Sequence, residues 1–401
     1  MTTKRTATEN RQKQRPEKAS HTAAEKKDSF FRRFMIFLLV SVLALGGLTG
    51  CLYYLDKKGE LSSLQERFSS SRSTSKKKGQ YYKDKKDTND SEDEKPDTIS
   101  DSSTSSSGYY MTEGAGHGDL SGYTIILDPG HGGKDTGCCY PFNNPDYNEC
   151  DFNLRIAERI HDELVSRGAT VYMLRTDDSW ISLYNRLAQV HLICLDIAEK
   201  EGKLPFSSAR ADELRELLQP CIDINEDTVA SGGMGIMVGS GVGEDLNDLF
   251  EMEYELDNVI FLSVHLNSSE SMTLHGTEIY YVTDESVIES EHRQMNNNSE
   301  FQRSDFPIRE DYYGRNNADN ELLACCLYDN IVGNIPEFAT NGHTTIADNY
   351  AVLREHGLNG ALIEVAFLSD TNDRNMLLQD ATLDDIASSV SDGVEVYFQQ
   401  K

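Results

Sequence analysis

The sequence lacks the short motifs by which many metal sites are recognised. It contains eight cysteines but no Cys-x-x-Cys pair, and it has no His-Glu-x-x-His motif, which excludes a zinc finger of the paired-cysteine type. Cys51 lies in an apolar segment, and the other seven cysteines follow it at irregular spacing. We therefore predict buried or free thiols and no disulfide framework. A single bridge, such as Cys194–Cys221, is left open.

Positive charge is also scarce over most of the chain. The sequence has 38 Lys and Arg against 67 Asp and Glu, a net charge of −29. Residues 1–120 hold 21 of the basic and 17 of the acidic residues, which leaves 17 basic and 50 acidic residues for the remainder. A domain of this charge is not expected to bind nucleic acid or an anionic membrane surface.

Long apolar runs are absent except for one, residues 34–55, which reads FMIFLLVSVLALGGLTGCLYYL without a charge. Its 22 residues are enough to span a bilayer core of roughly 30 Å. Arg32 and Arg33 precede it, so the positive-inside rule predicts a cytoplasmic N-terminus and an extracellular remainder. A cleaved signal peptide and lipidation at Cys51 within Leu-Thr-Gly-Cys are the alternatives. The apolar run continues past Cys51, which favours an uncleaved single-pass membrane anchor.

Composition divides the chain into four parts. The segment after the anchor is rich in Ser and charge and poor in aliphatic residues, which is typical of a linker. The parts are a basic cytoplasmic tail (1–33), the transmembrane anchor (34–55), a disordered extracellular linker (56–120) and one folded domain (121–401).

The domain alternates strand and helix patterns, which predicts an α/β fold with a mostly parallel or mixed sheet of about six strands and helices on both faces. Strands are expected at 123–128, 169–175, 258–267, 276–283 and 360–369, and helices at 151–168, 181–198, 320–332, 373–378 and 384–398. Residues 199–257 and 286–317 fit neither pattern and are predicted to be insertions that do not extend the sheet.

Reactive side chains stand where the predicted strands end. His131 follows the first strand, His265 lies near the end of the third, Glu364 lies in the last, and Glu149 opens the first helix. Groups at the carboxyl ends of neighbouring strands converge at one edge of a sheet. Two imidazoles and a carboxylate form a common open zinc set. A satisfied core histidine and an ion-paired glutamate remain the alternatives at this point, and the other histidines of the domain are candidates without a role: His161, His191, His275, His292, His343 and His356.

Five longer stretches of the sequence together resemble a known protein family. The stretches TIILDPGHGGKDTG, NECDFNLRIAERIHDEL, FLSVHLNSS, HGTEIYY and ALIEVAFLSD, in this order, resemble the zinc-dependent N-acetylmuramoyl-L-alanine amidases of the amidase-3 type, which are bacterial cell-wall hydrolases. The resemblance implies that His131, Glu149 and His265 bind Zn²⁺ and that Glu364 is the catalytic carboxylate.

The resemblance also implies a substrate and a reaction. Peptidoglycan would be cleaved at the amide between N-acetylmuramic acid and L-alanine of the stem peptide, by zinc-activated water, outside the membrane. A zinc peptidase acting within stem peptides and a non-catalytic wall-binding or regulatory module are the alternatives.

Some relatives cover the site with an extra helix until an activator protein removes it. Either insertion is a candidate for such a gate, and an activator protein is a candidate partner. A surface elaboration that shapes the choice of substrate is the alternative explanation.

Overall fold

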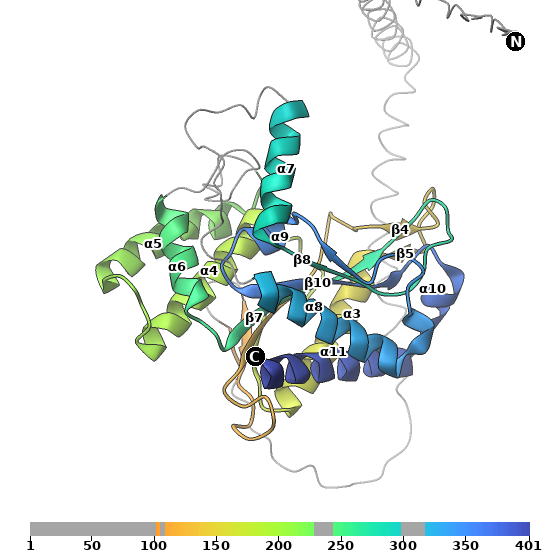
Figure 1. Cartoon of the computed structure of the whole chain (residues 1–401), viewed down its shortest axis with the longest axis horizontal. Coiled ribbons are helices and arrows are strands. Elements are labelled where there is room, and N and C mark those ends of the chain that lie inside the picture. The colour runs from red at the N-terminus through yellow and green to blue at the C-terminus, as the bar shows by residue number, and fades with distance from the viewer. Residues whose placement is uncertain (1–101, 105–108, 228–243, 298–316) are drawn as a thin grey trace, which may run out of the picture. The chain divides into compact units, whose positions relative to one another are not determined.

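The computed structural model describes residues 102–104, 109–227, 244–297 and 317–401, all of which belong to one unit, Asp97–Lys401 (Figure 1). The predicted tail, the predicted anchor and most of the predicted linker lie outside the described residues. Among the helices of these described ranges, none is both long and apolar enough to cross a membrane.

A mixed eight-stranded sheet forms the centre of this unit, in the order β1-β2-β6-β3-β7-β10-β8-β9. The inner strands β6, β3, β7 and β10 are parallel to one another, and β2 and β8 pair antiparallel with β6 and β10 at the two sides. The strands are β1 (Ser102–Thr104), β2 (Tyr110–Thr112), β3 (Thr124–Pro129), β6 (Thr170–Met173), β7 (Val259–Asn267), β8 (Glu278–Tyr281), β9 (Thr345–Ala347) and β10 (Asn359–Phe367). The mixed α/β sheet is confirmed, although it has more strands than the six predicted.

The additional strands are short, and two of them precede the predicted domain start. Strand β2 pairs with β6, and Tyr109 beside it is buried. Folded structure therefore begins before Ser121, within the predicted linker 56–120. A three-residue strand with mixed polarity gives too little pattern for detection from sequence.

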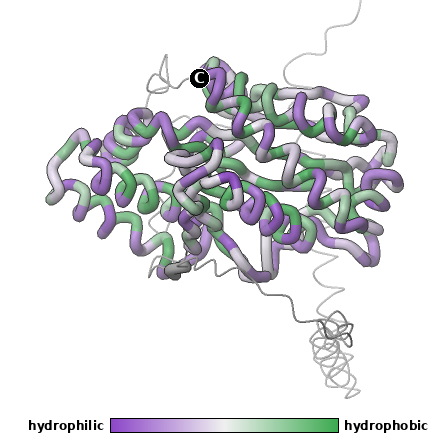
Figure 2. Tube along the Cα trace, turned by 90° about the horizontal axis from the view of Figure 1, so that it is seen from below, coloured by the Kyte–Doolittle hydropathy of each residue, from purple (hydrophilic) through white to green (hydrophobic). Residues whose placement is uncertain are grey.

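Apolar side chains on both sides of the central strands explain why helices cover both faces. In β3, Ile125 and Leu127 belong to one core cluster, whereas Ile126 between them belongs to the other. Successive side chains of a strand point to opposite faces, so an uninterrupted apolar run indicates a strand covered on both sides. Figure 2 shows the apolar stretches running through the interior.

The first face is covered by α3, α8, α10 and α11, with α11 packed against both α3 and α8 (Figure 1). In α3, Phe152, Ile156, Ile160 and Leu164 recur at four-residue spacing and are buried, as the sequence predicts. The bounds are α3 (Glu149–Ser166), α8 (Asn317–Asn334), α10 (Thr371–Leu377) and α11 (Asp380–Gln400).

The second face is covered by α4 and by helices from the two insertions. The described parts of the insertions are helical and add no strand to the sheet, as predicted. The bounds are α4 (Leu183–Glu201), α5 (Ser208–Ile224), α6 (Glu244–Tyr254), α7 (Asp284–Asn297) and the short α9 (Ala351–Arg354).

The strand register places the candidate site residues at the carboxyl edge of the sheet. Pro129 of β3 is the partner of Val264 in β7, and His265 of β7 is the partner of Glu364 in β10. The carboxyl ends of β3, β7 and β10 therefore lie side by side, and the loops that follow them form a common rim.

Candidate metal and catalytic site

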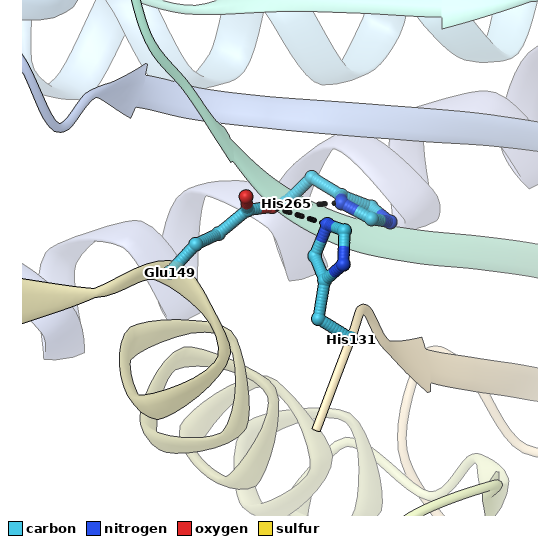
Figure 3. A group of neighbouring side chains, drawn as sticks. All are labelled: His131, Glu149 and His265. Atoms are coloured by element: carbon cyan, nitrogen blue, oxygen red, sulfur yellow. Dashed lines mark hydrogen bonds and ion pairs between the residues drawn. The ribbon is translucent and has the colours of Figure 1, made fainter. Parts of the chain in front are cut away.

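Three side chains from three different elements meet at this rim (Figure 3). His131 follows β3, Glu149 is the first residue of α3, and His265 lies in β7. Glu149 Oε1 is 3.2 Å from His131 Nε2 and 2.8 Å from His265 Nδ1. One ligand atom of each residue lies within 4.8 Å of the others. The group could therefore hold one metal ion.

Close backbone approach makes this cluster possible. A side chain at Gly130 would bring its Cβ to 2.4 Å from His265 Nε2, and one at Gly137 would come to 2.3 Å from Glu149 Oε2. No real contact of a Cβ is that short, so both positions need glycine for the histidine and the carboxylate to pack where they do.

Glu149 is nearly fully buried, and both of its carboxylate oxygens accept hydrogen bonds. Its Oε2 accepts a 2.7 Å hydrogen bond from the Cys138 amide, and its Oε1 accepts from the Leu266 amide at 3.2 Å and from Asn153 Nδ2 at 3.2 Å. Burial alone would raise the pKa of Glu149, but the hydrogen bonds from His131 and His265 outweigh it and lower the pKa. The carboxylate is therefore kept ionised and fixed.

His131 is held in an uncommon conformation. Its φ is 62°, in the left-handed region that non-glycine residues rarely adopt. On the side chain, Nδ1 is 2.9 Å from Asp135 Oδ2, which leaves Nε2 facing Glu149. Burial would lower the pKa of His131, but the hydrogen bonds to Glu149 and Asp135 raise it to about 9. A carboxylate on the second ring nitrogen is the usual support of a metal-binding histidine.

Two buried arginines hold the loop that carries His131. Arg186 donates to Asp128, to the Pro129 carbonyl at 2.9 Å and to the His131 carbonyl. Arg175 donates to the Pro129 carbonyl at 3.2 Å and to the Gly130 carbonyl at 3.1 Å. These bonds satisfy the carbonyls of Pro129, Gly130 and His131, and they stabilise the left-handed histidine.

Glu364 stands beside the cluster without being part of it. Its Oε2 is buried and has no hydrogen-bond partner among the described residues. Burial raises the pKa of Glu364 well above its ordinary value, and the negative charge of Glu149 adds to this effect. An unpartnered buried oxygen on a residue that lines a cavity is available for a proton or a water.

The cluster opens into a cavity of about 520 Å³, a size typical of small-ligand sites. His131, Glu149, His265 and Glu364 all line it, and Trp180 and Tyr350 contribute aromatic walls.

The four residues predicted from the sequence are thus brought together, whereas the remaining histidines of the described ranges lie outside the cluster. His161 contacts Asp162 and Thr112, and His191 pairs with buried Glu253. Arg175 and Arg186 were not predicted from the sequence. Arg186 is a charged residue in α4, a helix with a long run of buried residues. Such a charge within a largely apolar helix could have indicated a functional residue.

The cysteines behave as the sequence predicts. The seven described cysteines are free thiols, including Cys194 and Cys221. Cys150 groups with Asp151 and Asp178 away from Glu149, and burial together with Asp151 raises the pKa of its thiol to about 12. It is therefore a poor competitor for a metal at Glu149.

No acidic side chain from the described parts of the insertions belongs to the His131, Glu149 and His265 cluster. One insertion residue, Asp227, lines the cavity. The predicted gate gains no support from these residues, and segments 228–243 and 298–316 lie outside the described residues.

The fold and the site define an α/β protein with a cluster of two histidines and a glutamate at the carboxyl edge of its sheet. Residues 125–198 and 222–396 match the N-acetylmuramoyl-L-alanine amidase family. This match covers more than half of the chain, and the chain belongs to this family of enzymes.

Individual relatives agree with this assignment. The chain is 26% identical over 282 residues to the germination-specific N-acetylmuramoyl-L-alanine amidase of Bacillus subtilis, covering 70% of this chain and 82% of that protein. A shorter stretch of 69 residues is 48% identical to the probable cell wall amidase LytH of Staphylococcus aureus, covering 17% of this chain and 23% of that protein.

Solved structures of amidases are similar at lower identity. The N-acetylmuramoyl-L-alanine amidase of Clostridium difficile 630 matches with a TM-score of 0.41 and 21% identity, over 70% of this chain and 98% of that one. The CwlD amidase of Clostridioides difficile, solved in complex with the GerS lipoprotein, matches with a TM-score of 0.41 and 19% identity, over 70% of this chain and all of that one.

Proposed function

We propose that this cell-wall amidase is a zinc enzyme that hydrolyses the amide between the lactyl group of N-acetylmuramic acid and L-alanine of the stem peptide. The observation that carries the proposal is the convergence of His131, Glu149 and His265 beside Glu364 in one cavity. It is also supported by the membership of the chain in the amidase family.

The donor set fits zinc. Two imidazole nitrogens and one carboxylate oxygen are a common three-ligand set in catalytic zinc sites, which keep a further position open. Glu149 and His131 are already oriented by partners on their outer atoms, the Cys138 amide and Asp135. When bound, zinc would polarise the scissile carbonyl and lower the pKa of water at the site.

The chain itself supplies the rest of the reaction. Glu364 lines the cavity, and its Oε2 has no competing partner among the described residues, so the carboxylate would be free to accept the proton of the attacking water. The protonated carboxyl would then deliver this proton to the leaving amine of L-alanine. The walls around Trp180 and Tyr350 would position the stem peptide and exclude bulk water.

Product analysis tests the proposed bond. The full chain is incubated with purified peptidoglycan, and the soluble products are identified by mass spectrometry. We expect intact stem peptides with free L-alanine amino termini. Fragments cut within the stem would indicate a zinc peptidase instead, and binding without release would indicate a non-catalytic module.

We further propose that residues 34–55 anchor the enzyme as a single-pass membrane protein with its catalytic unit on the cell-wall side. An activator protein is an additional candidate partner. The anchor is supported by the charge-free run of 22 residues and the preceding arginines. Deletion of residues 34–55 should move the protein from the membrane pellet to the supernatant, and an unchanged distribution would contradict the anchor.

A further inference from the structure

Most of helix α5 lies outside the family match, whereas Asn225 and Asp227, which follow the helix, lie just inside it. The match stops at residue 198 and resumes at 222, within α5 (Ser208–Ile224). We propose that the end of this helix is a specificity element of the cavity: Asn225 positions one wall, and Asp227 favours stem peptides that carry a free ammonium group. The inference rests on the proposed amidase function and names the substrate class of that same site.

Asn225 joins α5 to the cavity wall. It ends the helix in the left-handed conformation with a φ of 48°. Its Oδ1 accepts from the Ser182 amide at 2.9 Å and from Asn185 Nδ2 at 3.1 Å, and its Nδ2 donates to the Trp180 carbonyl at 3.0 Å. One side chain thus fixes the segment that carries Trp180 and the start of α4.

The body of α5 is held firmly enough to act as a support. Its buried residues Ala211, Leu214, Leu218 and Cys221 lie in the same core cluster as α4. At the surface, Arg215 pairs with Asp196 and Glu199 of α4 at 3.0 and 2.8 Å. The position of Asn225 is therefore set by packing along the whole helix, and so is the wall that Asn225 holds.

Asp227 supplies the charge of this wall. It lines the cavity, and its Oδ1 accepts a 3.4 Å hydrogen bond from the Tyr184 amide. Among the described residues it forms no ion pair, whereas the other aspartates that line the cavity, Asp128 and Asp135, face Arg186 and His131. Asp227 thus presents an uncompensated negative charge to the ligand.

Peptidoglycan stems carry a matching cation. A stem whose diamino residue is not acylated ends that side chain in a free ammonium, whereas a stem that accepts a cross-link at this amine carries a neutral amide there. The diamino residue follows L-alanine by two positions, or about 7 Å of extended chain. A carboxylate on the cavity wall therefore favours stems with a free diamino side chain over stems that are acylated there.

Two matched substrates test this preference. We compare kcat/KM of the full chain for a muramoyl tripeptide ending in lysine and for its Nε-acetyl derivative. Because Asp227 is exposed to solvent, the advantage of the free amine should be modest, about 2- to 5-fold, and it should shrink in high salt. D227N should bring the ratio to about one.

Asp223 provides the matched control, because it carries the same charge on the last turn of α5, is exposed and is not among the cavity-lining residues. D223N should keep the wild-type ratio. Equal rates on both substrates in the wild type, or an unchanged ratio in D227N, would overturn the inference while leaving the amidase function intact. Failure of the wild type to cleave either substrate would overturn both.

The role of Asn225 can be tested by tryptophan fluorescence, because Trp180, whose carbonyl Asn225 holds, is the only tryptophan of the chain. Glycine tolerates a positive φ, so N225G removes the three hydrogen bonds without straining the backbone. We expect a shifted tryptophan emission and a KM raised about 3- to 10-fold with kcat changed less, as for lost ground-state binding. Unchanged emission and KM would refute the positioning role.

Discussion

Replacement of Arg186 by methionine is the most informative perturbation of the site that leaves the four proposed catalytic and metal-binding residues in place. Arg186 and its partner Asp128 are both buried, with side-chain exposures of 8% and 1%. The second oxygen of Asp128 accepts a 3.0 Å hydrogen bond from Ser263 Oγ, so the carboxylate cannot turn toward solvent. Methionine fills much of the same volume but leaves this carboxylate charged, buried and without its cation.

The expected loss can be worked from these contacts. Removal of one partner from a buried ion pair costs about 3–5 kcal/mol because the remaining charge is uncompensated. The His131 carbonyl also loses its donor, which adds about 1 kcal/mol, whereas the Pro129 carbonyl keeps its hydrogen bond from Arg175. We therefore expect R186M to lower the free energy of unfolding by at least about 3 kcal/mol. The double variant D128N/R186M should recover part of this loss.

Urea unfolding of the full chain, followed by circular dichroism, measures the change. Arg210 provides the control, because it pairs with Asp245 and Asp248 but is 24% exposed, and R210M should cost no more than about 1 kcal/mol. If R186M and R210M shift the unfolding midpoint equally, the reasoning that the Asp128–Arg186 pair stabilises the His131 loop is refuted. Midpoints can be compared in this way when the variants have similar m-values, the slopes of unfolding free energy against urea concentration.

Three further predictions concern the site and the core. E364Q should retain the metal but lower kcat about 10²- to 10⁴-fold, because the carboxylate that moves the proton is gone; normal release of stem peptides by this variant would remove Glu364 from the mechanism. D135N should weaken zinc affinity about 10- to 100-fold by releasing His131 Nδ1, as measured by competition with a chelating dye, and unchanged affinity would contradict this support. I126A, in a fully buried position of β3, should cost about 2–5 kcal/mol in urea unfolding, and a loss below 1 kcal/mol would contradict the two-sided core.

The central sheet and the convergence of the four candidate site residues could be predicted because their signals are local. The strand Thr124–Pro129 has three consecutive apolar residues, Ile125–Leu127, and α3 repeats its apolar residues every four positions. The strand ends then place His131, His265 and Glu364 at one edge by the geometry of parallel strands alone.

The contacts of Arg175 and Arg186, and the cavity wall that Asn225 holds, could not be predicted, because they join residues far apart in the sequence. Arg186 reaches Asp128 across 58 residues of sequence, and Asn225 reaches Ser182 across 43. Helix α5 does carry apolar residues at helical spacing, from Leu214 to Cys221. Its place against α4 and the cavity follows only from the packed structure, because the same stripe would fit any apolar face.

The central claim is that His131, Glu149 and His265 form a zinc site, and the metal content of the purified full chain tests it most directly. Inductively coupled plasma mass spectrometry should find about one zinc per chain in the wild type, because three such ligands make a complete catalytic set. E364Q should keep this zinc, and H265A should lose it. A wild-type chain without zinc, or an H265A variant that retains as much zinc as the wild type, would contradict the account.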